Sequence, residues 1–161
     1  MIVDLGCGGT KRGDIGIDVH ATPAVDYIVH LGVEPLPFAD NSVDRFVAYD
    51  FLEHLPVRSW VLTPEGLLTS VYSRIQLIRE VYRCLKPGGT FFSRTPGHAP
   101  EWAQDPTHEA PPWLPETWDY YCGSYAGVGQ QYGITFAFEL VDRHWDGPHL
   151  CVELRKPQAD S

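Results

Sequence analysis

A glycine-rich loop follows the first apolar run of the chain. In "VDLGCGG", Gly6, Gly8 and Gly9 come directly after residues 1–5, which read as a short buried strand. Glycines at a strand end let backbone N–H groups approach a ligand that a side chain would block. Asp18 ends the next apolar segment, where its carboxylate can accept hydrogen bonds from both hydroxyls of a ribose. We expect a small-molecule site here, although a tight turn beside a surface carboxylate would use the same residues.

The spacing argues against a nicotinamide dinucleotide. A GxGxxG pattern that starts at Gly6 would need its last glycine where Lys11 stands. The acidic residue of that motif also lies about 20 residues further on, whereas Asp18 follows Gly6 by 12. A nicotinamide-dependent oxidoreductase is therefore disfavoured.

A second set of polar residues could bind a substrate or take part in a reaction. The set comes from "DFLEHLP" and "DPTHE" and comprises Asp50, Glu53, His54, Asp105, His108 and Glu109. A histidine can act as a base near neutral pH or orient a substrate. We expect His108 to do so because it lies in a loop that the substrate must pass, the alternative being a histidine that braces the loop. For His54, a catalytic role and a structural role are both open. Glu53 is expected to be structural.

Some of these side chains are also metal-ligand types. His98, Asp105, His108 and Glu109 could be read in that way, but HExxH or another short ligand spacing does not occur in the sequence. The sequence therefore predicts no metal site.

The elements that position these residues follow from the apolar pattern. Five strands are expected, at residues 1–5, 14–18, 25–31, 43–50 and 90–95. A long helix is expected to begin at Thr63 and Pro64 and to end at "KPGG", because apolar residues recur at helical spacing from Leu67 to Leu85. Residues 134–142 and 149–155 alternate with period two, which is typical of an antiparallel hairpin.

Together these elements predict one α/β domain over residues 1–161. Its sheet is open, Rossmann-like and mostly parallel, with the hairpin closing it over residues 134–156. Residues 1–95 form the ligand-binding half. Residues 96–133 form an aromatic and proline-rich segment with one short helix at "PETWDYYC". Its aromatic side chains could line a substrate pocket or form a satellite core under the long loop, and Trp113 and Tyr121 are the more pocket-like of them.

Four segments resemble a known family in their order and register. "VDLGCGG", "GIDV", "LPFADNSVDRFVAYDFLEHL" and "LIREVYRCLKPGGTFFSRTP" look like class I S-adenosylmethionine-dependent methyltransferases. The closest pattern is the small-molecule branch often labelled type 11.

The resemblance assigns cofactor-binding roles to matching positions. Asp4, Gly6, Cys7 and Gly8 would surround the methionine part of the cofactor. Asp18 and Val19 would bind the ribose, and the segment that starts at Leu36 would lie beside the adenine.

Tyr49 and Asp50 would form the floor beneath the sulfonium in such an enzyme. The resemblance has three departures: Thr10 replaces a loop glycine, His30 stands where an acid often accepts the adenine amino group, and the usual N-terminal helices are absent. A cofactor site without these helices should be open, unless residues 96–133 or a second copy of the chain cover it. A homodimer is therefore an expectation.

The composition argues against nucleic-acid-binding, exported and membrane proteins. With 21 acidic and 12 basic residues, the formal charge of −9 repels phosphate backbones, so nucleic acid is a disfavoured partner. Four separated cysteines and the lack of a long apolar run or leader indicate a cytoplasmic protein that does not cross a membrane.

The expected function is methyl transfer from S-adenosylmethionine to a small-molecule or sugar-like acceptor. A non-catalytic protein that binds S-adenosylmethionine, as a sensor or subunit, is the alternative. A nucleic-acid methyltransferase is less favoured because "DFLEHL" stands where an (N/D)PP(Y/F) element would be.

Overall fold

The computed structural model describes residues 1–97 and 101–158. His98 lies outside these residues. The side chain of Trp102 is also outside the description.

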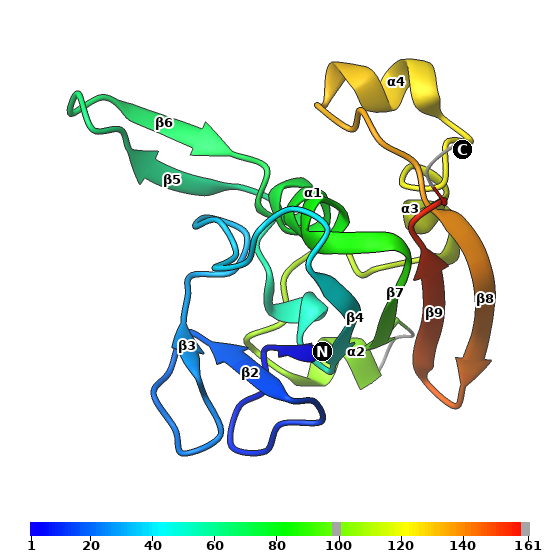
Figure 1. The fold of residues 1–161 in the computed structure, drawn as a ribbon, viewed down its shortest axis with the longest axis horizontal. Helices are drawn as coiled ribbons and strands as arrows, with labels where there is room; N and C mark the ends of the chain where they lie inside the picture. The colour runs from blue at the N-terminus through cyan, green and yellow to red at the C-terminus, as the bar shows by residue number, and fades with distance from the viewer. Residues whose placement is uncertain (98–100, 159–161) are drawn as a thin grey trace.

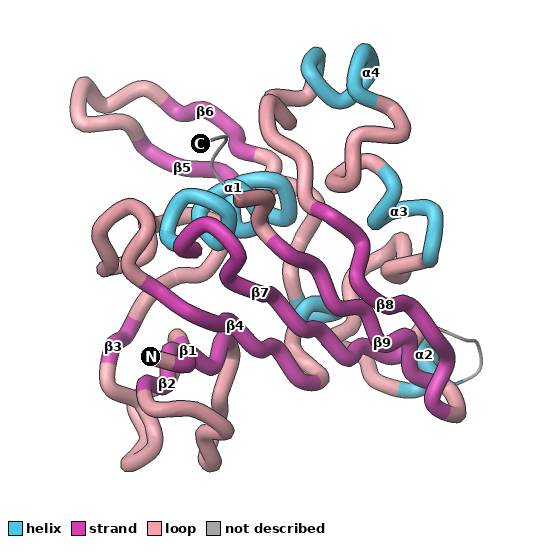
Figure 2. Tube along the Cα trace, turned by 45° about the vertical axis from the view of Figure 1, so that its right-hand side comes forward, coloured by secondary structure: helices cyan, strands magenta, loops and turns pink. Residues whose placement is uncertain are grey.

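One seven-stranded sheet organises the chain (Figures 1 and 2). Its strands are β1 (Ile2–Leu5), β2 (Ile15–Asp18), β3 (Tyr27–Ile28), β4 (Val43–Tyr49), β7 (Leu85–Pro96), β8 (Glu139–Asp146) and β9 (His149–Arg155). Their order is β3-β2-β1-β4-β7-β9-β8, with parallel pairing from β3 to β7 and antiparallel pairing of β9 with both β7 and β8. The predicted fold class, a mostly parallel open sheet with an antiparallel C-terminal hairpin, is confirmed.

The long helix is shorter than the sequence indicated. Helix α1 runs over Ser73–Cys84, while the residues before it form a separate hairpin of β5 (Ser59–Leu62) and β6 (Leu68–Val71), which projects from the body in Figure 1. The side chain and main chain of Thr63 both bond Leu67, and Gly66 adopts φ +83°, so Thr63 begins a turn rather than a helix. The prediction was wrong for residues 63–72 because the turn and the β-branched Val61 and Val71 outweighed the helical spacing.

Short helical elements occupy the connections that carry polar residues. They are the 3₁₀ helix η1 (Leu52–His54), α2 (Glu101–Gln104), α3 (Pro115–Asp119) and α4 (Ala126–Gln131). Helix α3 falls inside the short helix that the sequence predicted. Residues 6–42 contain no helix, so the β1–β2 and β2–β3 connections are bare loops.

The sheet buries one face. Phe46, Phe91 and Leu154 are aligned across β4, β7 and β9, and all three are inaccessible to solvent. They share one core with Leu77, Ile78 and Val81 of α1 and with the tryptophans of the aromatic segment. Because Trp113 is fully buried and Tyr121 nearly so, both residues belong to this core and do not line a pocket.

The opposite face of the sheet is polar and half-exposed. Arg45, Thr90 and Arg155 are aligned on it, as are Tyr49 and Arg94. Arg45 pairs with Glu153 at 2.9 Å across β7. Parallel sheets usually have helices on both faces, so this domain has one hydrophobic layer where two are usual.

Candidate cofactor and acceptor site

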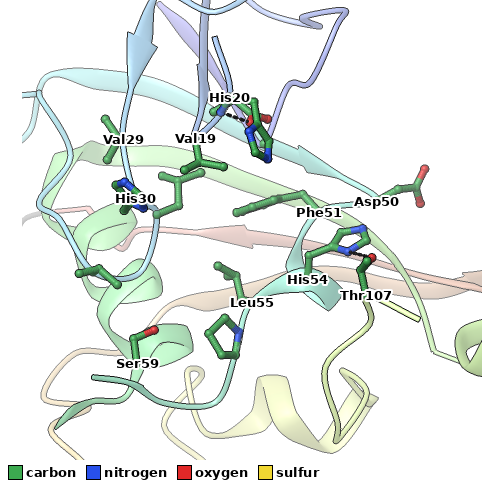
Figure 3. A pocket seen from close by; sticks show the side chains of 15 residues that line it. Val19, His20, Val29, His30, Asp50, Phe51, His54, Leu55, Ser59 and Thr107 are labelled. Atoms are coloured by element: carbon green, nitrogen blue, oxygen red, sulfur yellow. Dashed lines mark hydrogen bonds between the residues drawn. The ribbon is translucent and has the colours of Figure 1, made fainter. Parts of the chain in front are cut away.

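A cavity of about 620 Å³ opens beyond the carboxyl ends of β1, β2 and β4 (Figure 3). This end of a parallel sheet is where open α/β folds bind ligands. Its lining comes from the glycine loop, the residues after β2 and β3, the β4–η1 connection and the 105–109 loop. The predicted residues that line it are Gly6, Asp18, Val19, His30, Asp50 and His54.

Gly6 has a conformation and a neighbour that only glycine tolerates. Its φ is +67°, and a Cβ at this position would lie 2.2 Å from the ring of Phe51. Phe51 itself lines the cavity after β4. The glycine therefore lets the loop approach the β4 side closely.

Asp18 joins the loops that follow β1 and β2. Its two carboxylate oxygens accept hydrogen bonds from the N–H groups of Gly8 and His20, each at 2.9 Å. A carboxylate has about four acceptor positions, so Asp18 can bind two further donors in the cavity. Gly8 does not itself line the cavity, but its N–H holds the Asp18 carboxylate in place.

The end of the cavity beside β2 and β3 is mainly apolar. Val19, Val29, Leu31 and Val33 line it together with His30. His30 projects from the loop after β3, and its N–H donates to Glu34 at 2.6 Å, which fixes the backbone at this point.

Four other residues with expected cofactor contacts lie outside the cavity. Asp4 is buried under the loop and accepts the Arg12 N–H at 2.6 Å, and burial raises its pKa. Cys7 is buried beside Ala24. Leu36 lies in the core, and its N–H donates to Glu80.

Tyr49 is the fourth, on the polar face of the sheet. Its ring packs against Phe92 with ring centroids 5.2 Å apart, and the Arg12 guanidinium lies 4.5 Å from the ring centre. These residues shape the loops and strands around the cavity.

Asp50 occupies a strained position at the end of β4. Its φ is +49°, and its carboxylate receives two bonds from the Arg94 guanidinium at 2.8 Å. His149 Nε2 lies 3.2 Å from the same carboxylate, and Arg94 donates to His149 Nδ1. Because Nδ1 accepts, the neutral ring of His149 carries its proton on Nε2 and donates it to Asp50.

A second, smaller cavity of about 330 Å³ adjoins the first. It is lined by Asp50, Glu53, His54, Pro96, Asp105, His108, Pro148 and His149. Asp50 and His54 line both cavities. The two cavities thus meet at the residues that the sequence marked as catalytic, and His108 lies in the smaller one.

His108 faces two carboxylates. Its Nε2 lies 4.0 Å from Glu53 Oε1 and 3.8 Å from Asp105 Oδ2, and its ring meets that of His54 edge-on at 4.9 Å. Glu53 is 1% exposed, burial raises its pKa, and Thr95 donates to its other oxygen at 2.8 Å.

The 105–111 loop is attached to η1 at several points. Glu109 N–H donates to the Glu53 carbonyl, and Thr107 bonds His54, as Figure 3 shows on the side of the cavity away from His30. The buried Arg74 donates to the carbonyls of Leu55, Glu109 and Pro111 and so links both segments to α1.

Sequence reasoning missed several lining residues. Thr107 lies inside the "DPTH" segment and could have been found there. Phe51 lies inside "DFLEHLP" and could also have been found, whereas Ser59 and His149 had no signal, because their place depends on the tertiary arrangement of the β5–β6 hairpin and β9.

The chain has the Rossmann-like fold of class I methyltransferases. The order of the strands and the cavity at the carboxyl ends of the parallel strands define this fold class. Residues 16–93 match the family model described as "Methyltransferase domain". The resemblance recognised in the motifs is thereby confirmed over this part of the chain. No curated protein matches the chain.

Solved structures support the fold over nearly the whole chain. A Bacillus halodurans C-125 protein assigned as a methyltransferase is 14% identical, with a TM-score of 0.60 and coverage of 98% of this chain and 92% of that one. A chain from the complex between the Haloferax volcanii Trm112 methyltransferase activator and the methyltransferase assigned with it has 16% identity, a TM-score of 0.58 and coverage of 99% and 83%.

N-methyltransferase NodS of Bradyrhizobium japonicum WM9, solved with S-adenosyl-L-homocysteine, is 12% identical to this chain. Its TM-score is 0.54, with coverage of 98% of this chain and 78% of that one. Within residues 1–97 and 101–158 of this chain, none of the helices has the length and apolarity that crossing a bilayer requires.

Proposed function

We propose that the protein transfers a methyl group from S-adenosylmethionine to a small-molecule acceptor. The main support for this proposal is a cavity lined by Gly6 and Asp18. It lies at the carboxyl ends of β1 and β2, in a sheet with the methyltransferase strand order. The methyltransferase domain match over residues 16–93 supports the same chemistry.

The lining fits the cofactor in three respects. The glycine loop gives close backbone approach for an amino-acid tail, and Asp18 retains acceptor capacity for ribose hydroxyls. Valine side chains and His30 offer an apolar surface with one polar group for a purine. The cavity volume of about 620 Å³ lies in the range of ligand sites, about 300–1,000 Å³.

When bound, S-adenosylmethionine supplies a methyl group already activated by a sulfonium. The protein then has to hold the acceptor at near-attack distance and exclude water. We assign this work to His108, His54 and Asp50, which line the smaller cavity, and of these His54 and Asp50 also line the larger one. Asp50 is kept rigid by Arg94 and His149.

A small acceptor is favoured over a nucleic acid. The smaller cavity is about 330 Å³, and three of its lining residues, Asp50, Glu53 and Asp105, are carboxylates. Such a surface repels phosphates, as does the net charge of −9.

Calorimetric titration tests the cofactor, with S-adenosylmethionine and S-adenosylhomocysteine as ligands and NAD as the control. We expect micromolar binding of the first two and none of NAD. Formation of S-adenosylhomocysteine with members of an acceptor panel then separates an enzyme from a non-catalytic binding protein. Absence of cofactor binding would contradict the proposal.

A further inference from the structure

We propose that Glu53, His54 and His108 form a binding site for a divalent transition-metal ion of the Zn²⁺ type. One carboxylate oxygen of Glu53 and one ring nitrogen from each histidine lie within 4.8 Å of one another. This inference rests on the proposed function in one respect: the ion would hold an oxygen or nitrogen of the acceptor.

The separation between His108 and Glu53 suits a shared ion better than a direct hydrogen bond. The 4.0 Å between His108 Nε2 and Glu53 Oε1 is too long for a hydrogen bond. Two ligands of one tetrahedral zinc ion, each bonded at about 2.0–2.2 Å, lie about 3.4 Å apart. A contraction of roughly half an ångström, within the reach of side-chain rotation, would bring this pair to such a separation.

A hydrogen-bond relay gives His54 the tautomer that a ligand needs. The Thr107 hydroxyl lies 2.6 Å from Asp105 Oδ1 and 2.9 Å from His54 Nδ1. The carboxylate can only accept, so the hydroxyl gives its one proton to Asp105 and must accept from His54. The Nδ1 of His54 therefore carries the hydrogen, and its Nε2 has a free electron pair. Metal-binding histidines are typically oriented by such outer partners.

The surroundings favour a cation. Asp50, Glu53 and Asp105 line the smaller cavity, and the Arg94 guanidinium beside them is already paired with Asp50 at 2.8 Å. With neutral histidines, these four side chains carry a net charge of −2. Two imidazoles and a carboxylate are a ligand set that Zn²⁺ accepts, and three protein ligands leave a position for a substrate atom.

The proposal departs from the expectation that the chain has no metal site. That expectation considered ligands close together in sequence, whereas Glu53 and His108 are joined through the attachment of the 105–111 loop to η1. Asp105 contributes as a positioning residue through Thr107, and His108 acts as an acceptor-orienting group through the ion.

Titration of the metal-stripped full chain with ZnCl₂ tests the site. We expect one equivalent to bind, with affinity at least a hundredfold lower in His54→Ala and in His108→Ala. Thr107→Val retains every ligand but breaks the relay, so its affinity should fall about tenfold. His144→Ala is the matched control, because His144 is exposed on β8 and pairs with Asp142, and its binding should equal that of the wild type.

Substitution with Co²⁺ gives an independent readout, because a site with two imidazoles produces d–d absorption bands that should disappear in His54→Ala. Absence of stoichiometric Zn²⁺ binding, or equal affinity in all variants, would overturn the proposal.

Titration of the same variants with S-adenosylmethionine tests the proposed function independently of the metal site. Asp18→Ala should lose S-adenosylmethionine and keep Zn²⁺, whereas His54→Ala should lose Zn²⁺. Wild-type protein that binds the cofactor without Zn²⁺ would overturn the metal site alone. Wild-type protein that binds Zn²⁺ without the cofactor would overturn the proposed function.

Discussion

At the scale of single residues, Asp18 serves both the fold and the proposed ligand. It holds the N–H groups of Gly8 and His20 and still faces the cavity. Its carboxylate therefore connects the glycine loop to the proposed position of the ribose.

Replacing Asp18 by alanine should lower the affinity for S-adenosylmethionine about a hundredfold. Two charge-assisted hydrogen bonds to the ribose are lost, each contributing roughly 1.5 kcal/mol, and every 1.4 kcal/mol changes affinity about tenfold. Isothermal titration measures the change, with the exposed Asp142→Ala on β8 as control. Unchanged affinity in Asp18→Ala would remove this residue from the site.

The buried Glu80 makes an ion pair with the partly exposed Arg83, and this pair has a defined pH dependence. It is 7% exposed, accepts the Leu36 N–H at 2.9 Å and pairs with Arg83 at 2.7 Å. Burial alone would raise the pKa of Glu80, but the Arg83 and Leu36 bonds outweigh it and leave the pKa below the ordinary value of 4.5. The unfolded chain therefore binds the proton more readily.

The contribution of Glu80 to stability is complete above pH 4.5 and is lost as the pH falls through the lower pKa of the folded state. Glu80→Gln should reduce the free energy of unfolding at pH 7 by about 1–3 kcal/mol, and the difference from wild type should shrink in acid. Urea denaturation at pH 7 and in acid, below pH 4.5, measures the free energy of unfolding of wild type and variant. The exposed Glu139→Gln is the control. A constant difference at all pH values would contradict the assignment.

At the scale of elements, α1 supports the acceptor side through one buried cation. Arg74 donates to the carbonyls of Leu55, Glu109 and Pro111 at 2.6–3.0 Å, and its guanidinium lies 5.2 Å from the Trp113 ring centre. Three loop carbonyls thus depend on one side chain of the helix.

Arg74→Ala should leave these carbonyls unpaired and lower the free energy of unfolding by about 3 kcal/mol. Denaturant unfolding measures the loss, and Arg58→Ala, which removes an exposed guanidinium beside Tyr72, should change stability little. Equal effects of both substitutions would show that the three carbonyls do not depend on Arg74.

The elements also show how far a sequence can be interpreted. Strands β1, β2 and β4 and the loop at Gly6 follow from apolar runs that end in glycine or an acid, which are local signals. The β5–β6 hairpin was not predictable in this way, because Leu67, Leu68 and Val71 fit a helical spacing while Thr63 and Gly66 form a turn.

Long-range arrangements were beyond sequence reasoning for a different reason. The sequence left a pocket and a core position open for Trp113 and favoured the pocket, yet its indole N–H donates to the Leu52 carbonyl and its ring packs on Trp118 in the core. The approach of Glu53 to His108 depends on the same packing of the aromatic segment. No local pattern specifies such contacts.

At the scale of the whole molecule, the β5–β6 hairpin exposes apolar side chains. Trp60, Leu62 and Leu68 are about 70% exposed, and the strand register places them on one face. Grouped apolar exposure of this kind is typical of interaction surfaces.

We predict that the hairpin mediates self-association, in line with the expected homodimer. Analytical ultracentrifugation over a concentration series should show a dimer for the wild type and a monomer for Trp60→Ser combined with Leu62→Ser. Val128→Ser on α4, also exposed, should remain dimeric. A wild-type monomer at every concentration would contradict this prediction.

The polar second face of the sheet has a thermodynamic consequence. The heat capacity increment of unfolding grows with apolar area exposed and is reduced by polar area, averaging about 12–15 cal/mol/K per residue. Because Arg45, Tyr49, Arg94 and Glu153 already meet water on that face, unfolding exposes less new apolar surface than in a sheet covered on both sides. The increment should fall below that average, and the stability of the domain should vary less with temperature on either side of its maximum.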